Sequence, residues 1–542
     1  MQNLLYSTFR YTKSLKEVAA NGLETIVGEQ VYTYLTKTNF STDWDTLYEQ
    51  CPWSTPFQSY DFISTWYKLF KKAYSPILVI QTRNNKLAGL LPLAIDAKGK
   101  IVYAGADLAE YQVWLTNPIY EDEFIEQAIL EINNLYPGKT IPFKFIPRGA
   151  PLHWIERKFA FKNRCEIITH RQPLLRINYD SLVKELKKKN RKEKVNRLKR
   201  LGELQFIKVT DSTEFDSILN ELVIQSDFRK GAMFDSCLFI NSTARIEFLS
   251  SLFRLNLLHV TTLKLNDAII ASNVGIFGKK WLHLQGINTH SPTHAKYSPG
   301  ILHFLMLGLF LSEEKFEVFD LTPGTDGYKE TIATDYNVVH EVNFHTLPNL
   351  LLNKFKRQAK SSIQRCLKRI GVSAFALKNL TKRVQIYKQK VGLLKHYTIP
   401  NYRLGSIKNH FSNYAEPLNI INLKAHSSLD LVHFEVNSLS DLLHYNPKGT
   451  LQTRWEFLGD AMKRFEAGQQ CYTWLENDLL LACAWISSTK NPILMSPPPK
   501  DFILDRLYLH PSVANQIDRV RYSILDAIIK MNTESILYYK LK

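Results

Sequence analysis

The residues best suited to chemistry lie between positions 281 and 335. A polar loop there ends in Tyr297-Ser298-Pro299-Gly300, and an apolar segment begins at Ile301. Ser and Pro directly before such a segment are start signals of a helix, whose first N–H groups have no acceptor within the helix. Those N–H groups and the positive end of the helix dipole can hold a phosphate. We therefore expect a cofactor-binding loop that consists of Tyr297, Ser298, Pro299, Gly300 and Ile301.

Three side chains suited to proton transfer follow this loop. Asp320 ends a strand predicted over residues 316–321, and Tyr328 and Lys329 follow a turn at Gly324. A carboxylate can accept a proton from a nucleophile, a phenol can protonate a leaving group, and an ammonium group can neutralise a phosphate. We predict Asp320, Tyr328 and Lys329 as catalytic residues. The structural alternatives are that Asp320 caps the Gly324 turn and that Tyr328 packs in the core.

No metal site is expected near the loop. His283, His290, His294 and His303 lie close to it in sequence, but no acidic residue stands at ligand spacing from them. We therefore expect these histidines to be structural or solvated. The six cysteines are scattered and form neither a zinc motif nor a disulfide framework, which is typical of a cytoplasmic protein.

The elements that must position these residues alternate between strands and helices. The segment from Ile301 is apolar nearly all round, which predicts a buried helix. Before it, residues 259–288 form an antiparallel meander with turns at Asn266-Asp267 and Gly278-Lys279. Residues 76–96 predict an earlier hairpin around Asn84-Asn85, and residues 31–35 predict a strand. Helices followed by a hairpin in both halves indicate a weak internal repeat.

The order and spacing of several residues resemble a known architecture. In the first half these are Trp44, Thr55-Pro56-Phe57-Gln58-Ser59, Phe62, Trp66 and Leu90-Leu91-Pro92-Leu93. In the second half they are Tyr297 to Gly300, Asp320-Leu321, Gly324 and Tyr328-Lys329. Over about residues 31–336 the chain resembles the two-fold GNAT architecture of Fem-type peptidyl transferases and, more closely, the CelD/BcsL-type acetyltransferases linked to cellulose biosynthesis.

This resemblance implies an α/β fold with mixed sheets, in which tandem GNAT-like domains transfer an acyl group directly from acetyl-CoA or another acyl-CoA. The chain departs from the family in its phosphate loop, because the motif Q/R-x-x-G-x-G/A has two glycines and this chain has only Gly300 there. A third segment, residues 402–542, again resembles a GNAT core. It has the glycine-free Ser512-Val513-Ala514-Asn515-Gln516 in place of the loop, so we expect it to be inactive.

The positive charge is concentrated in two segments. The net charge is +18, yet residues 184–200 contain ten Lys or Arg and two Glu, and no acid lies between Glu341 and Glu416. Localised basic segments imply an anionic partner. The basic helix at 184–200 is expected either to be a solvated face or to line a groove beside Asp227, Arg229 and Lys230. The arm at 354–395 is expected to contact tRNA phosphates or an acidic membrane.

These patterns predict five segments: a leader (1–30), an N-terminal GNAT-like domain (31–171), a second one with the acyl-CoA site (172–346), a basic helical arm (347–401) and the C-terminal domain (402–542). The leading hypothesis is an acyltransferase that acts on a saccharide, amino sugar or amine in exopolysaccharide or cell-envelope biosynthesis. The alternatives are an aminoacyl-tRNA-dependent Fem-type transferase and a catalytically inactive GNAT scaffold that docks on an anionic partner or a membrane. The candidate anionic partners of the basic segments are tRNA, an acidic lipid or a phosphorylated substrate. The longest apolar run is too short to span a bilayer, so we expect a cytoplasmic protein, peripheral at the inner membrane.

Overall fold

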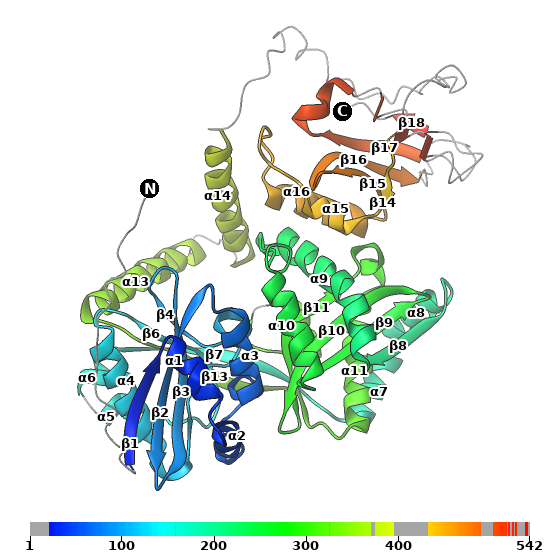
Figure 1. The fold of residues 1–542 in the computed structure, drawn as a ribbon. Coiled ribbons are helices and arrows are strands. Elements are labelled where there is room, and N and C mark those ends of the chain that lie inside the picture. Colours follow the sequence, from blue (N-terminus) through cyan, green and yellow to red (C-terminus); the bar gives the residue numbers. More distant parts are fainter. Residues whose placement is uncertain are drawn as a thin grey trace.

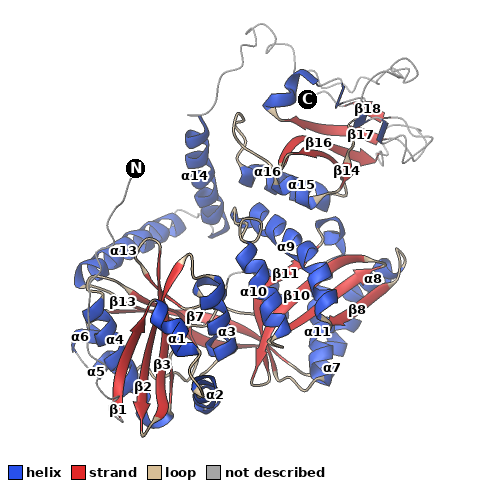
Figure 2. Ribbon diagram, in the orientation of Figure 1, coloured by secondary structure: helices blue, strands red, loops and turns tan. Residues whose placement is uncertain are grey.

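The computed structural model describes residues 21–157, 159–324, 326–369, 374–394, 432–488 and 502–516, together with the short pieces 519–520, 523–524, 526–527 and 537–539. It contains three sheets, which follow one another along the chain, and each is accompanied by helices (Figures 1 and 2). The predicted α/β class with mixed sheets is therefore confirmed. Within the described residues, every helix is too short or too polar to cross a membrane.

The first sheet is antiparallel and has the order β1-β2-β3-β4, with β5 paired to β3. Its strands are β1 (Asn21–Val27), β2 (Tyr74–Arg83), β3 (Lys86–Asp96), β4 (Ile101–Tyr103) and β5 (Leu115–Thr116). The predicted β2–β3 hairpin is confirmed, and Asn84 and Asn85 both have positive φ in its turn. Two successive positive φ values match the twist of a two-residue hairpin loop, and Asn tolerates them.

Four main helices accompany this sheet: α1 (Glu29–Leu35), α2 (Phe40–Gln50), α3 (Tyr60–Leu69) and α4 (Glu121–Leu135). The strand predicted at residues 31–35 is wrong, because these residues lie in α1. Val31 and Leu35 are four residues apart and both are buried. This helical spacing buries the two side chains on one face, which outweighs the strand preference of Val and Tyr.

The second sheet has eight strands in the order β6-β13-β7-β12-β11-β10-β9-β8. They are β6 (Ile141–Ile146), β7 (Cys165–Arg176), β8 (Leu204–Val209), β9 (Leu258–Leu265), β10 (Ala268–Gly278), β11 (Trp281–His290), β12 (Val318–Asp320) and β13 (Asp335–Phe344). The predicted meander is β9-β10-β11. Strand β7 runs across the boundary predicted at residues 171–172 and pairs with β12 and β13; the boundary itself stays a prediction.

Six main helices belong to this part: α7 (Tyr179–Lys187), α8 (Lys189–Lys199), α9 (Ser212–Phe234), α10 (Thr243–Arg254), α11 (Pro299–Glu313) and α12 (Gly327–Ile332). The predicted basic helix is divided into α7 and α8 at Lys188. The predicted buried helix is α11, whose Leu302, Phe304 and Leu307 are buried. The first and second sheets share a core, in which Phe62 of α3 packs edge-on against Phe248 of α10 at 5.2 Å between ring centroids.

The third sheet, of order β14-β15-β16-β17-β18, repeats the topology of one part of the second, β8-β9-β10-β11-β12. Strands β15 (Gln470–Glu476), β16 (Leu479–Ser488) and β17 (Phe502–Leu509) are antiparallel, and β17 then pairs in parallel with β18 (Leu537–Tyr539) over three residues. Strands β9, β10, β11 and β12 have the same relation, again with a three-residue parallel pair. A 3-10 turn follows the third strand in each case: η4 (Pro292–Tyr297) and η7 (Pro511–Gln516). The residues 512–516 singled out in the sequence lie in η7.

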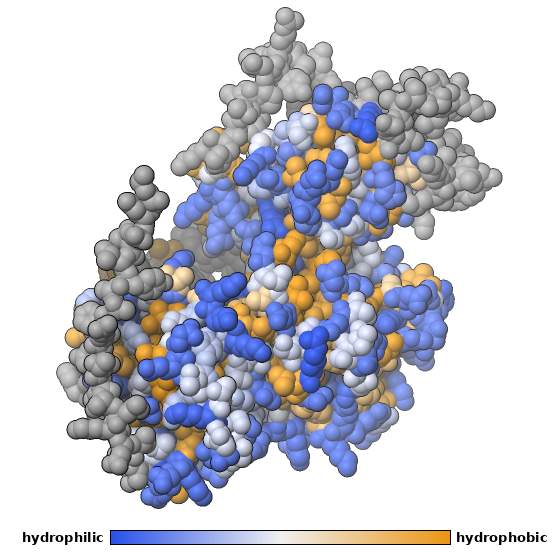
Figure 3. All heavy atoms as spheres, in the orientation of Figure 1, coloured by the Kyte–Doolittle hydropathy of each residue, from blue (hydrophilic) through white to orange (hydrophobic). Residues whose placement is uncertain are grey.

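The third sheet packs on α9 through α15 (Leu439–Leu443) and α16 (Arg454–Glu466); the short strand β14 (Glu435–Val436) completes it. Phe228 and Ala232 of α9 share a core with Leu458 and Phe465 of α16. A Cβ at Gly231 would lie 2.7 Å from Leu458 Cδ1, so the glycine permits this close approach. Hydrophobic side chains also gather at this junction on the face shown in Figure 3.

Residues 347–401, predicted as a basic helical arm, contain helices α13 (Leu347–Arg369) and α14 (Ala374–Leu394). Helix α13 is held to the body by an ion pair between Arg357 Nη1 and Glu166 Oε1 (3.0 Å). Helix α14 contacts the third unit, where Lys390 Nζ lies 2.7 Å from Glu456 Oε1. The two described helices of the arm are therefore each joined to a folded unit by an ion pair (Figure 1).

Candidate functional site

The site begins where two neighbouring parallel strands separate. Trp281, Leu282 and His283 of β11 pair with Val318, Phe319 and Asp320 of β12. Strand β12 ends at Asp320, whereas β11 continues to His290. Beyond His283, the described edge of β11 that faced β12 is therefore open.

Two cations from the last turns of α9 reach this open edge. Arg229 Nη1 donates to Asn288 O (3.0 Å), and Lys230 Nζ donates to Gly286 O (2.6 Å). Burial lowers the pKa of Lys230. These two carbonyls would otherwise accept hydrogen bonds from the N–H groups of a neighbouring strand. Here they accept them from two positively charged side chains instead.

The loop after β11 places the start of α11 beside the opening. Ser298 adopts a left-handed conformation, with φ 53°, and Pro299 begins the helix. The amides of Ile301 and Leu302 both donate to Ser298 O, at 3.1 and 3.2 Å. Pro299 has no N–H group, so Gly300 provides the first amide of the helix, without an acceptor inside it. The first turn presents fewer amides to a ligand than the sequence suggested.

A lysine of the basic helix reaches the same loop. Lys194 Nζ of α8 donates to Ser298 Oγ at 2.8 Å. The two residues are 104 positions apart in the chain, and the sequence alone gave no reason to pair them. A phosphate at the start of α11 would meet this ammonium group as well as the Gly300 amide.

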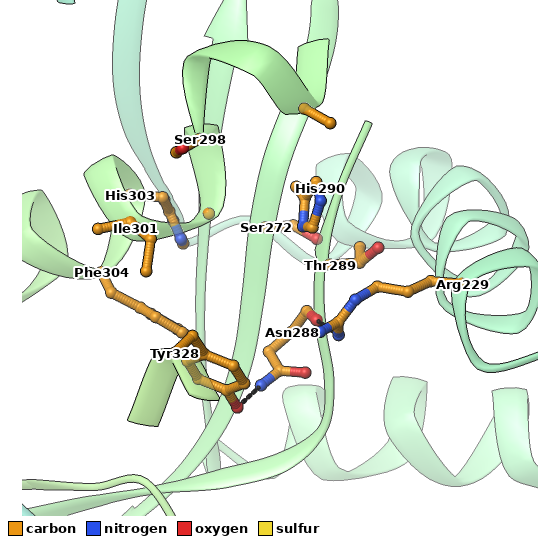
Figure 4. A pocket seen from close by; sticks show the side chains of 12 residues that line it. Arg229, Ser272, Asn288, Thr289, His290, Ser298, Ile301, His303, Phe304 and Tyr328 are labelled. Atoms are coloured by element: carbon orange, nitrogen blue, oxygen red, sulfur yellow. Dashed lines mark hydrogen bonds between the residues drawn. The ribbon is translucent and has the colours of Figure 1, made fainter. Parts of the chain in front are cut away.

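A cavity of about 190 Å³ lies between α11, the end of β11 and α9. Figure 4 shows Arg229 and α11 approaching residues 288–290 of β11 from opposite sides. Three predicted cofactor-loop residues line it, namely Ser298, Gly300 and Ile301, and so does Tyr328. The remaining lining residues are Arg229, Ser272, Asn288, Thr289, His290, Ala295, His303 and Phe304. Tyr297 and Pro299 lie in the loop but outside this lining.

Tyr328 is held firmly in the cavity. Its ring stacks on Phe304 at 5.7 Å between centroids, and its hydroxyl accepts a hydrogen bond from Asn288 Nδ2 at 2.7 Å. Burial, and then the charge of Asp326, raise the pKa of Tyr328 to about 12. The phenol therefore stays protonated at neutral pH and has a proton to give.

Asp320 lies outside the cavity lining, in a buried network. Its carboxylate accepts hydrogen bonds from Tyr111 Oη (2.5 Å) and Thr322 N (2.8 Å), and its Oδ2 lies 2.7 Å from His283 Nδ1. Asp320 is fully buried, and burial followed by the Asp320 charge raises the pKa of Tyr111 well above its usual value. The network ties the first half of the chain to the point where β11 and β12 separate. No sequence pattern pointed to Tyr111, which lies 209 positions from Asp320.

Lys329 also points away from the cavity. Its Nζ donates to Thr322 O (3.0 Å), with Thr322 Oγ1 at 3.3 Å and Pro323 O at 3.4 Å. Burial lowers the pKa of Lys329. These contacts join Lys329 to the residues that follow β12, and its catalytic role stays a prediction.

The histidines near the loop have separate environments. Burial lowers the pKa of His290 to about 4, assisted by Arg229, and that of His303 to about 3. His303 Nε2 lies 3.0 Å from Thr261 Oγ1. Both imidazoles are therefore neutral at pH 7. Within the part of the chain that the structure describes, no cluster of three His, Cys, Asp or Glu side chains is placed to hold a metal ion.

Comparison with known protein families agrees with this geometry. Residues 186–330 match the family model described as "Acetyltransferase (GNAT) domain". This segment of the chain is thus similar to GNAT acetyltransferase domains. It extends from the end of α7 into α12 and includes every residue that lines the cavity. No curated protein matches the chain.

Several solved structures are similar over more than half of the chain. One is the C-terminal domain of a putative lysylphosphatidylglycerol synthetase from Agrobacterium fabrum, at 11% identity and TM-score 0.39, covering 58% of this chain and 94% of that one. FemX matches at 11% identity and TM-score 0.39 over 57% and 97%. A tandem GNAT protein from the clavulanic acid biosynthesis pathway matches at 10% identity and TM-score 0.35 over 59% and 98%.

Proposed function

We propose that the protein is a GNAT-superfamily acyltransferase of the CelD/BcsL type, which transfers an acyl group from acetyl-CoA or another acyl-CoA to a polar acceptor such as a saccharide, amino sugar or amine. The observation that carries this proposal is the opening between β11 and β12, with the start of α11 and Lys194 beside it. An amide-containing ligand that paired with this edge would replace Arg229 and Lys230 at the carbonyls of Asn288 and Gly286. A helix start with a lysine beside it can hold the phosphates of that ligand. A place in exopolysaccharide or cell-envelope biosynthesis follows only from the resemblance.

The residues have distinct tasks in this proposal. Lys194, Ser298 and the Gly300 amide hold the donor's phosphates. Tyr328 gives its proton to the thiolate that leaves when an acceptor nitrogen or oxygen attacks the thioester carbon, and its phenolate is reprotonated by the proton that the attacking group releases. Asp320 was predicted as the base, but its buried contacts with Tyr111 and His283 support a positioning task. The contacts of Lys329 likewise support holding the turn that carries Tyr328.

Calorimetric titration of the full chain with CoA tests the proposal. We expect a dissociation constant on the order of 1–100 μM. Lys194→Gln removes a charge-assisted contact from a half-buried site and should weaken binding about tenfold. Lys192→Gln, on the exposed side of the same helix, is the matched control. In Gly300→Trp the indole would extend toward His290, because a Cβ at Gly300 already lies 3.4 Å from His290 Nδ1. This variant should lose binding.

A tRNA-borne donor is a second candidate, because many cations of α7 and α8 have no acidic partner in the structure. Among the described ion pairs of these helices, Glu185 neutralises Lys188 and Arg191, and Glu193 neutralises Arg197. The other lysines and arginines of 184–200 are left to an external anion. Salt-sensitive binding of aminoacyl-tRNA without CoA binding would favour this donor. If the chain binds neither CoA nor aminoacyl-tRNA, the remaining hypothesis is the inactive scaffold.

Helix α13 supports peripheral contact with an acidic membrane. Its solvent-exposed side includes Leu351 (66% exposed), Phe355 (71%) and Ile363 (59%). Lys354 lies on the same helix, whereas Arg357 is already paired with Glu166. Exposed apolar residues beside cations are typical of a helix that lies in a lipid interface. The expected cytoplasmic location at the inner membrane rests on this helix and on the resemblance.

A further inference from the structure

Arg229 is a cation without an acidic partner. It lines the cavity, and its Nη1 donates to a backbone carbonyl, Asn288 O. Its Nε is buried and has no hydrogen-bond partner. No described ion pair includes Arg229. The acid two positions earlier, Asp227, is occupied by the amides of a neighbouring loop (Leu238, Phe239 and Ile240).

Two buried hydroxyls line the same cavity without a partner. Ser272 of β10 and Thr289 of β11 are opposite each other in the sheet register. They are 1% and 3% exposed, and neither Oγ nor Oγ1 has a hydrogen-bond partner in the structure. Buried hydroxyls are nearly always hydrogen-bonded. Because these two line the cavity, a polar group of a ligand can reach them there.

The cavity lining contains one permanent charge, and it is positive. Besides Arg229, the titratable lining residues are His290, His303 and Tyr328, which are neutral at pH 7 for the reasons given above. The guanidinium offers a fork of N–H donors, and each hydroxyl can donate one hydrogen bond. Donors without a competing acid suit a carboxylate, which accepts several hydrogen bonds.

We propose that this end of the cavity is a subsite for a carboxylate of the ligand, held by Arg229 with Ser272 and Thr289. The subsite is distinct from the phosphate position at Ser298, which lies on the other side of β11 (Figure 4). The carboxylate belongs either to the acyl group of the donor or to the acceptor. The cavity of about 190 Å³ equals about six water volumes, enough for a short acyl chain. The inference rests on the proposed function only in the case where the carboxylate belongs to the acyl donor.

Matched ligand pairs, in which one member carries a carboxylate and the other carries none, test the subsite by calorimetry on the full chain. Succinyl-CoA against butyryl-CoA tests the donor. L-alanine against L-alaninamide, with CoA present, tests the acceptor. Succinate against succinamide, without CoA, tests the subsite independently of the donor. In at least one pair we expect the carboxylate to bind about 10- to 100-fold more tightly. Arg229→Gln should abolish that difference, and Thr289→Val should reduce it.

Thr262→Val is the control for the hydroxyl. Thr262 of β9 is paired with Ser272 on the other side, and its hydroxyl is equally buried and unpartnered, but it does not line the cavity. The Thr262→Val substitution should leave the preference for the carboxylate ligand unchanged. A preference that survives in Arg229→Gln, with an unchanged melting temperature as proof of folding, would overturn the subsite. So would equal binding within all three pairs. If no CoA ester binds, the proposed function fails, while the succinate and alanine pairs still decide the subsite.

Discussion

Replacing Tyr111 by Phe removes one hydroxyl from the network that joins the two halves of the chain. Tyr111 is 1% exposed and donates to Asp320, which is fully buried. The substitution withdraws a charge-assisted donor from a carboxylate that water cannot reach. It also leaves Gln172 Nε2, which donates to Tyr111 Oη at 2.8 Å, without its acceptor. The ring itself keeps its place, so little packing is lost.

The expected loss of stability follows from the type of acceptor. Hydrogen bonds to charged groups contribute about 1.5–3 kcal/mol, and neutral ones about 0.5–1.5 kcal/mol. Tyr103→Phe is the matched control, because Tyr103 is equally buried but donates to the neutral Val113 O at 2.8 Å. Tyr111→Phe should therefore lower the free energy of unfolding by about 1 kcal/mol more than Tyr103→Phe.

Urea unfolding followed by tryptophan fluorescence measures this difference. With a slope of about 3 kcal/mol per molar urea, the midpoint of Tyr111→Phe should fall by about 0.5–1 M and that of Tyr103→Phe by about 0.2–0.5 M. Equal midpoints for the two variants, or an unchanged midpoint for Tyr111→Phe, would refute the charged network at Asp320.

Three further predictions concern the cavity and α13. Tyr328→Phe should lower kcat about 100-fold or more in a thiol-release assay while KM changes little. Because the pKa of Tyr328 is about 12, the wild-type rate should show no loss from phenol ionisation below about pH 11. An unchanged kcat in Tyr328→Phe would show that Tyr328 takes no part in proton transfer. The folded-state pKa of His290 is about 4 and its ordinary value 6.5, so the unfolded chain binds that proton more readily and stability falls as pH drops from 6.5 towards 4. Denaturation at pH 7 and pH 5 should show about 2 kcal/mol less acid destabilisation for His290→Asn, and identical losses would contradict the buried neutral imidazole. Phe355→Ser should weaken sedimentation with anionic lipid vesicles, while Lys192→Gln, on α8, leaves it nearly unchanged; sedimentation that is insensitive to Phe355 would place the membrane contact elsewhere.

The local fold was largely readable from the sequence, because turns and periodicity are local signals. Asn84-Asn85 and Asn266 mark hairpin turns in which Asn tolerates positive φ, and the all-round apolar pattern after Ile301 marks a buried helix. The wrong strand prediction at residues 31–35 arose because local signals conflict there. A short segment carries both strand propensity and helical spacing, and only its packing partner decides between them.

The site was only partly readable, because its decisive contacts join distant segments. The loop at Ser298 and Gly300 and the phenol of Tyr328 lie in the cavity, as the pattern suggested, but their chemical tasks stay predictions. Lys194 was noticed only as one of many basic residues, and the sequence does not reveal which lysine of α8 points at Ser298. Ser272 and Thr289 are ordinary strand residues until the register places them opposite each other. Asp320 stands at a strand end as expected, yet Tyr111 buries it.

Hydrogen–deuterium exchange of the full chain, with and without CoA, tests the central claim most directly. If CoA binds at the opening between β11 and β12, peptides that cover residues 284–302 should exchange more slowly in its presence, and this protection should weaken in Lys194→Gln. Unchanged exchange there at saturating CoA, or protection confined to residues 502–516 of the third unit, would contradict the account.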